Sequence, residues 1–296
     1  MNIGNRSTRH TGLVVAALAL VSTAVTAFAQ PPLPPPQELD RLVQRIALYP
    51  DPLLSQVLAA ATFSNQIPDA ARWADQHHYL TGDQLAGAIN ADQLPWDPSV
   101  QALLPFPSVL DMMASDRNWT DRLGDAFLAS QGDVMDAVQR MRHAAYDYGY
   151  LRSNGQVIVR GGPYIEIGLA NPGFVIVPYY DPLIVFARPR PGFVVGGAIR
   201  FGFGISIGAA YRPWGWGGGY NRFDWGGHAV FVNNRPWART YVNRETYSHP
   251  YEVRRYEPAA RRPEESHAVH ERSDREREAA RTGRGRVEEH RGGRER

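Results

Sequence analysis

The chain has 296 residues, a net charge of +2, no cysteine and no lysine, so all 32 of its cationic side chains are arginines. A chain without cysteine has no disulfide, no thiolate metal ligand and no cysteine nucleophile. The small net charge hides an asymmetry: residues 37–150 hold 15 acids against 7 arginines, and residues 151–251 hold 10 arginines against 4 acids. The two halves are therefore predicted to present surfaces of opposite charge, which can meet each other or separate partners.

The first 29 residues have the pattern of a secretory signal peptide. Two arginines precede a short apolar run at residues 13–21, and residues 27–29 read Ala-Phe-Ala, a typical cleavage site before Gln30. The run is short for a membrane span. We expect export to the periplasm or cell envelope with cleavage near Ala29-Gln30, the alternative being an uncleaved N-terminal anchor.

Helical spacing of apolar residues dominates the next part of the chain. Residues 30–36 are a proline-rich linker, and residues 37–150 are predicted to form a compact all-helical domain. Asp51 and Asp97 each precede a proline, so each is predicted to cap a helix whose first residue is that proline. Asp133 is predicted to cap the longest helix. Short helices with proline corners favour a compact orthogonal bundle.

Residues 151–211 change to a β pattern. Short β-branched runs between Gly, Pro and Asn turns predict a small antiparallel β region with strands near residues 156–159, 164–167, 174–177 and 183–186. The glycine-rich stretch 192–211 has two interpretations, namely further strands or a membrane helix with small residues four apart. Arg200 near its centre and the poor helix propensity of glycine favour strands.

The last parts of the chain are of low complexity. Residues 212–251 are rich in Gly, Trp and Arg and offer little for a conventional core. Residues 252–296 hold 13 arginines and 11 acids and are predicted to be a disordered charged tail. The aromatic and arginine side chains of the first part suit stacking on sugars, contact with an anionic polymer or a lipid interface, or stacking only on one another. The candidate interaction residues are Trp214, Trp216, Tyr220, Arg222, Phe223, Trp225 and Trp237.

The fold is accordingly predicted to be α+β, with a helical domain followed by a small antiparallel β region and a disordered tail. No serine nucleophile motif, phosphate loop or dinucleotide fingerprint occurs. His77 and His78 are adjacent and would point about 100° apart on a helix. Asp121 and Asp125 lie four apart, as expected for a surface face. The sequence predicts no catalytic residue, no cofactor and no metal site.

Several sequence blocks resemble a bacterial family of exported proteins whose defining domain has no assigned function. The resemblance covers about residues 38–187 and implies export and an envelope location, without supplying catalytic residues. The blocks are residues 38–43 (ELDRLV), 47–54 (ALYPDPLL), 70–73 (AARW), 96–103 (WDPSVQAL), 118–127 (NWTDRLGDAF), 133–140 (DVMDAVQR) and 177–182 (VPYYDP).

The leading hypothesis is a non-enzymatic structural or interaction protein of the cell envelope, with a protein, glycan or lipid surface as its unknown partner. Nucleic acid is not an expected partner of an exported chain. One alternative is an envelope glycan or peptidoglycan hydrolase, or its accessory subunit, with Trp73, Trp96 or Trp119 lining a groove. Another is membrane association through residues 192–211.

Overall fold

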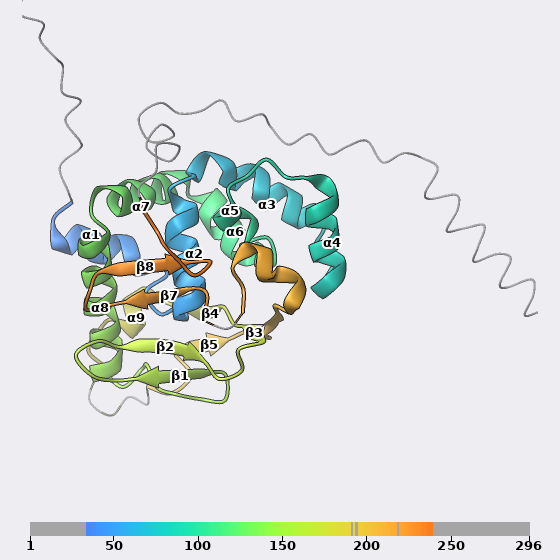
Figure 1. The fold of residues 1–296 in the computed structure, drawn as a ribbon. Helices are drawn as coiled ribbons and strands as arrows, with labels where there is room; N and C mark the ends of the chain where they lie inside the picture. The colour runs from blue at the N-terminus through green and yellow to red at the C-terminus, as the bar shows by residue number, and fades with distance from the viewer. Residues whose placement is uncertain (1–33, 191, 193–194, 218, 239–296) are drawn as a thin grey trace, which may run out of the picture. The chain divides into compact units, whose positions relative to one another are not determined.

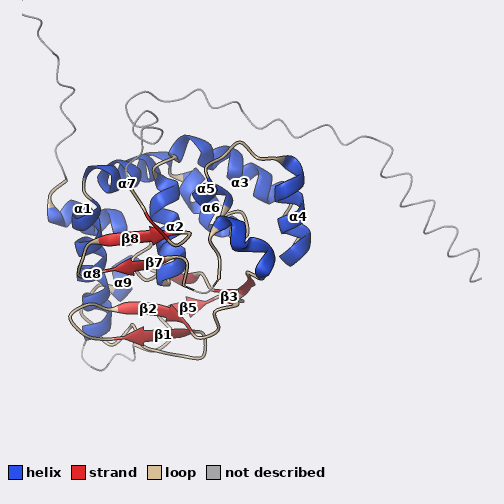
Figure 2. Cartoon of the chain, viewed as in Figure 1, coloured by secondary structure: helices blue, strands red, loops and turns tan. Residues whose placement is uncertain are grey.

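The computed structural model describes residues 34–190, 192, 195–217 and 219–238. The predicted signal peptide, residues 30–33 of the proline-rich linker and the predicted disordered tail lie outside the described residues. Within them, the predicted α+β class is confirmed, because helices are followed by short antiparallel strands (Figure 1, Figure 2). The helices are α1 (Pro36–Val43), α2 (Asp51–Ala61), η1 (Ser64–Gln66), α3 (Ile67–Gln76), α4 (Gly82–Asp92), α5 (Pro98–Gln101), α6 (Pro107–Ser115), α7 (Arg117–Ala129), α8 (Gln131–Asp147), α9 (Pro182–Val185) and η2 (Ala209–Trp214).

The strands pair in small antiparallel groups. Strand β1 pairs with β2, β3 with β6 and β4 with β5, while β7, β8 and β9 form a three-stranded meander. Ribbons this small are marginal alone and need a packing partner. Their bounds are β1 (Val157–Arg160), β2 (Glu166–Leu169), β3 (Phe174–Val175), β4 (Pro178–Tyr180), β5 (Ile199–Phe201), β6 (Ile205–Ser206), β7 (Arg222–Asp224), β8 (Ala229–Val232) and β9 (Arg235–Pro236).

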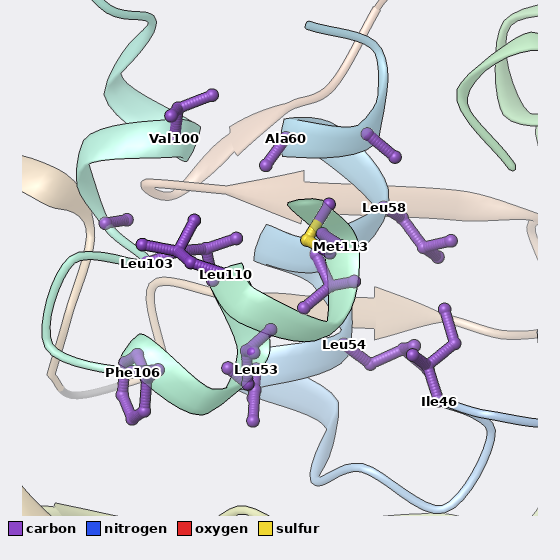
Figure 3. Packing of buried hydrophobic residues seen from close by; sticks show 14 of the residues in the cluster. Ile46, Leu53, Leu54, Leu58, Ala60, Val100, Leu103, Phe106, Leu110 and Met113 are labelled. Atoms are coloured by element: carbon purple, nitrogen blue, oxygen red, sulfur yellow. The ribbon is translucent and has the colours of Figure 1, made fainter. Parts of the chain in front are cut away.

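Helix α2 is the central element of the fold. Every residue from Leu53 to Ala61 is buried, which is the behaviour of a core helix and not of a surface helix. It contacts α5 and α7 as well as strands β2, β7 and β8 (Figure 1). Figure 3 shows Leu53 and Leu54 of α2 among Leu110 and Met113 of α6. The later strands and turns share this main core, which also contains Val175, Trp216 and Val230. A second, smaller cluster joins Leu48 and Ala145 of the helical part to Leu151, Val157, Ile165, Ile167 and Val185.

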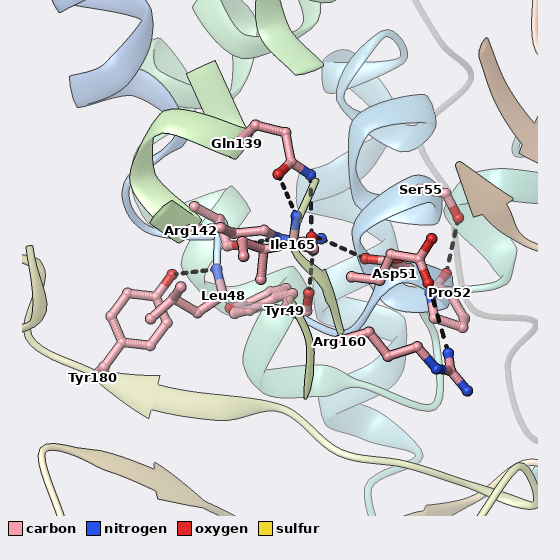
Figure 4. Close-up of polar contacts among 12 residues, drawn as sticks. Leu48, Tyr49, Asp51, Pro52, Ser55, Gln139, Arg142, Arg160, Ile165 and Tyr180 are labelled. Carbon is pink, nitrogen blue, oxygen red and sulfur yellow. Dashed lines mark hydrogen bonds and ion pairs between the residues drawn. The ribbon is translucent and has the colours of Figure 1, made fainter. Parts of the chain in front are cut away.

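A buried arginine ties this central helix to the β region (Figure 4). Arg142 of α8 is fully buried, and its guanidinium donates to the carbonyl oxygens of Ala47, Tyr49 and Ile165 at 2.8–2.9 Å. Its Nη1 lies 2.7 Å from Oδ1 of Asp51. Burial raises the pKa of the Asp51 carboxyl, and the nearby Arg142 charge opposes that shift. The corner before α2 and the start of β2 are thus joined by one side chain.

Two helix caps differ from the sequence-based prediction. Asp51 is not a cap, because α2 begins at Asp51 itself and its carboxylate turns to Arg142. Asp133 is likewise inside its helix, and Ser130 caps α8 by accepting from the Asp133 backbone N–H. The prediction at Asp97 is confirmed, since its carboxylate accepts from the Ser99 backbone N–H at 2.9 Å.

The structure also differs from the prediction in part of the β region. Residues 183–186 are not a strand, because Asp181 caps a short helix, α9, by accepting from the Leu183 N–H at 2.9 Å. The helix-starting effect of a capping aspartate followed by proline outweighs the strand preference of the β-branched residues after it. The described residues of the 192–211 stretch form β5, β6 and the start of η2, so the favoured strand interpretation holds there. Within the described part of the chain, none of the helices has the length and apolar character needed to cross a bilayer.

Candidate functional site

The tryptophans proposed as interaction residues are largely core residues. Trp214, Trp216 and Trp225 are 7%, 1% and 4% exposed. The Trp216 indole N–H donates to the Ala102 carbonyl at 2.9 Å, and that of Trp214 to Oε1 of Gln101 at 2.9 Å. The expectation that this segment contributes little to a core is wrong. These rings pack against the helices and are not accessible to an external ligand.

The other four predicted residues do not gather into one site. Arg222 is exposed and lies 4.0 Å from the centroid of the Phe231 ring. Phe223 stacks on Trp225 at 4.2 Å, and Trp237 packs on Phe127 at 4.4 Å. Tyr220 is 37% exposed at the edge of a small cavity of about 130 Å³. The groove tryptophans of the hydrolase hypothesis, Trp73, Trp96 and Trp119, are also buried in the core.

A cleft lies between α3, α4 and the β5–β6 turn, and we call it the apolar cleft. It encloses about 460 Å³, which is within the usual range for a binding pocket of about 300–1,000 Å³. His77, His78, Thr81, Ser206 and Tyr211 supply its polar groups. Most of its wall is apolar, including Ala74, Leu80, Leu85, Leu104, Pro105 and Ile205.

A single aromatic side chain stands at the mouth of the apolar cleft. Phe203 lines the cleft and is 99% exposed. Its two neighbours hold the turn close to the sheet. A Cβ added at Gly204 would lie 3.0 Å from the Cβ of Phe174, and one added at Gly202 would lie 3.3 Å from the Tyr179 ring. The phenyl ring is therefore presented to solvent by a tightly packed turn.

The surroundings of the apolar cleft are acidic. Residues 67–115 contain six aspartates and one arginine. Asp75 and Asp83 are exposed on α3 and α4, the helices that form one wall. Burial together with the Asp83 charge raises the pKa of Tyr211 in the cleft to about 12. The cleft thus has an apolar floor, and we call Asp75 and Asp83, which lie on the flanking helices and do not line the cleft, its acidic rim.

A second cleft lies on the other side of the start of α6, and we call it the tyrosine cleft. It encloses about 260 Å³ and is lined by Arg45, Tyr49, Ser108, Tyr179 and Tyr180, among others. Pro107 lines the apolar cleft and Ser108 lines the tyrosine cleft, so the first two residues of α6 separate the clefts.

The three tyrosines of this cleft play different parts. Tyr180 is structural, because its hydroxyl donates to the Gln44 carbonyl at 2.9 Å and accepts from the Leu48 N–H. Tyr179 is 51% exposed, and its hydroxyl lies 3.2 Å from Oγ of Ser108. Tyr49 is 4% exposed and donates to the thioether sulfur of Met112 at 3.7 Å. Burial raises the pKa of the Tyr49 and Tyr180 phenols, which therefore stay protonated.

Asp121 and Asp125 of α7 were expected to form a surface face. Asp121 is exposed, while Asp125 is half-buried, and burial together with the Asp121 charge raises the pKa of Asp125 to about 6. The folded state therefore binds a proton more tightly at Asp125 than the unfolded chain does. This group favours folding at low pH, and that contribution is lost as the pH rises from about 4 to about 6.

We therefore expect Asp125→Asn to raise the free energy of unfolding at pH 7.5, by on the order of 1 kcal/mol once solvent screening of a half-exposed group is allowed for. The gain over wild type should shrink toward pH 4 and vanish below about pH 3, where the wild-type carboxyl is protonated in both states. Urea unfolding at several pH values measures the difference. A gain of the same size at pH 4 and pH 7.5 would contradict the assignment.

The histidines and carboxylates that the structure describes do not form a metal centre. Nδ1 of His77 lies 2.8 Å from the Trp73 carbonyl oxygen, and its ring stacks on that of Trp73 at 3.9 Å. Among the residues that the structure describes, no three His, Cys, Asp or Glu side chains gather closely enough to hold a metal ion.

The fold and clefts define an α+β protein in which a central buried helix is enclosed by helices and small antiparallel ribbons. The family model described as "Protein of unknown function (DUF3300)" matches residues 35–260, and the chain belongs to this family. A relative in Escherichia coli (strain K12) is the uncharacterized protein YacH, 31% identical over 254 residues. The match covers 68% of this chain and 41% of YacH, so the chain spans about two fifths of that relative. No solved structure matches the chain.

Proposed function

We propose that the protein is a non-enzymatic interaction protein of the bacterial cell envelope, and that it binds a partner polypeptide at the apolar cleft. The observation that carries the proposal is the 99% exposed Phe203 at the mouth of an apolar cleft of about 460 Å³. Contacts that anchor protein interfaces are typically aromatic side chains and the pockets beside them. The envelope location is supported by the signal-like residues 1–29.

The acidic rim indicates what kind of segment the cleft accepts. Asp75 and Asp83 lie on the two helices of its wall, and Arg72 of α3 is already paired with Asp69 at 2.9 Å. A segment with an apolar anchor residue flanked by arginine or lysine complements both the floor and the rim. The polar side chains of the cleft, such as those of His77 and Tyr211, are suited to orienting a bound peptide by hydrogen bonds and less suited to catalysing a reaction of it.

Selection of random peptides displayed on phage against the full chain tests this proposal. We expect the wild-type protein to enrich peptides with an apolar anchor flanked by basic residues. Phe203→Ser should weaken their binding roughly tenfold, the equivalent of 1.4 kcal/mol, because it removes an exposed aromatic anchor. Fractionation of the producing bacterium should recover the protein in the envelope or periplasm.

Leu183→Ser is the matched control, because Leu183 is 81% exposed on α9 and does not line the cleft. Its peptide binding should equal that of wild type. Enrichment of acidic peptides, equal weakening by both substitutions, or recovery of the protein mainly in the cytoplasm would each contradict the proposal.

A further inference from the structure

The tyrosine cleft is separate from the apolar cleft and has a different chemistry. Its lining combines aromatic rings, hydroxyl groups and one guanidinium. Its volume of about 260 Å³ is below the range of about 300–1,000 Å³ that is common for drug-sized ligands. The cleft therefore suits one small ring or one unit of a longer chain.

Tyr49 is a buried phenol with a poor hydrogen-bond partner. Its O–H donates to the Met112 sulfur at 3.7 Å, and thioether sulfur is a weak acceptor. Burial of a polar group is costly unless it forms a good hydrogen bond. A ligand oxygen placed in the cleft would give this donor a stronger acceptor.

Tyr179 offers a ring face beside that donor. It is half exposed, one edge of its ring packs closely on Gly202, and its hydroxyl is held 3.2 Å from Ser108 Oγ. The face of an aromatic ring carries negative potential and attracts polarised C–H groups. The ring is thus a fixed platform for a ligand that is apolar on one face and hydroxylated at its edge.

Arg45 adds hydrogen-bond donors to the cleft, and most of its positive charge is balanced by an ion pair. Its Nη1 is 2.9 Å from Oδ2 of Asp116, and its guanidinium lies 5.4 Å from the Trp119 ring centroid. The ion pair offsets its charge, while a guanidinium keeps several N–H groups for other acceptors. The cleft therefore favours a neutral hydroxylated ligand over an anion.

We propose that the tyrosine cleft is a carbohydrate subsite that binds one neutral pyranose unit of an envelope glycan. The C–H face of the sugar packs on the Tyr179 ring. A sugar oxygen accepts from the Tyr49 hydroxyl, and further oxygens accept from Arg45 or bond with Ser108. The inference concerns a site distinct from the apolar cleft, and it stands even if no peptide binds there.

Isothermal titration of the full chain with two neutral probes, N-acetylglucosamine hexamer and maltohexaose, tests the proposal and separates an amino-sugar glycan from a glucan. We expect one of them to bind. Tyr179→Ala should weaken that binding roughly tenfold, which corresponds to 1.4 kcal/mol. Tyr49→Phe keeps the ring and the fold and should weaken it about fivefold through loss of the donor.

Tyr164→Ala is the control, because Tyr164 is a comparably exposed tyrosine that lines neither cleft. It should bind like wild type, and so should Phe203→Ser, which separates this proposal from the peptide site. Failure of the wild-type protein to bind either hexasaccharide at millimolar concentration would overturn the proposal. Binding that Tyr179→Ala and Tyr49→Phe leave unchanged would also overturn it.

Discussion

Replacing Arg142 with methionine is expected to lower the free energy of unfolding by about 3–5 kcal/mol, the range for breaking a buried ion pair by removing one partner. The substitution preserves a long apolar stem and removes the charge. It leaves Asp51 without its counter-charge and takes a donor from three carbonyl groups, those of residues 47, 49 and 165. Cation–π contact with Trp225, whose ring centroid is 4.8 Å away, is lost as well.

Arg140→Met on the same helix is the matched control. Arg140 is also paired with an aspartate, Asp40, at 2.7 Å, but its side chain is 41% exposed. Exposed pairs contribute about 0–1 kcal/mol, so the two substitutions differ mainly in burial. Urea denaturation followed by circular dichroism measures both. An equal loss of unfolding free energy in the two variants would show that the buried contacts of Arg142 do not stabilise the fold as the structure indicates.

Urea denaturation of wild type and Arg142→Met at acidic pH gives a second readout. Without Arg142, the Asp51 carboxyl keeps the burial that raises its pKa and loses the charge that opposes the shift. A raised folded-state pKa means that protonation favours the folded variant, so its deficit relative to wild type should shrink as the pH falls. A deficit that grows at acid pH would mean that Asp51 is not the group left unpaired.

Local signals in the sequence were sufficient for many helix boundaries. Asp97 followed by Pro98 starts a helix as predicted, and Gly149, with its φ of +86°, lies just beyond α8. Thr81 occupies the N-cap position of α4, although its side chain makes no cap hydrogen bond. Each of these depends on residues within about one helical turn, where capping and backbone preferences decide the outcome.

The Arg142 cluster joins residues far apart in the chain, and local patterns could not reveal it. A faint signal exists in α8, because Arg142 falls four residues after Val138 and three before Ala145, both buried. A charged residue at the spacing of an apolar stripe indicates a buried side chain that needs partners. The sequence does not say which carbonyl groups supply them.

The aromatic segment was misjudged for a different reason. Its glycines made it look like a low-complexity stretch, yet those glycines allow turns that place Trp214 and Trp216 against the helices. Gly215 has a φ of +83°, and a Cβ there would lie 3.0 Å from Asn221 and Asn233. The two clefts could not be predicted either, since each combines helix residues with residues of the later ribbons.

A second large loss of stability is expected on substitution of Gly124, which lies where α7 crosses α2. A Cβ at this position would overlap the carbonyl oxygen of Ala61 and lie 2.7 Å from its carbonyl carbon. The obstacle is backbone of the central core helix, which cannot rotate away as a flexible side chain would. Overpacking of a dense core costs about 1–3 kcal/mol, and a backbone clash belongs at or above the upper end.

Gly124→Ala should therefore lower the free energy of unfolding by about 3 kcal/mol or more, with a fall in melting temperature of about 6–12 °C at 2–4 °C per kcal/mol. Gly87→Ala is a control of opposite sign, because Gly87 is in α4 and an added Cβ there meets nothing within 4 Å. It should stabilise the protein by about 0.5–1 kcal/mol through helix propensity alone. Calorimetry of wild type, Gly124→Ala and Gly87→Ala measures the three melting temperatures. If Gly124→Ala melts at or above the wild-type temperature, α2 and α7 do not approach as closely as the structure has them, and the central position of α2 must be revised.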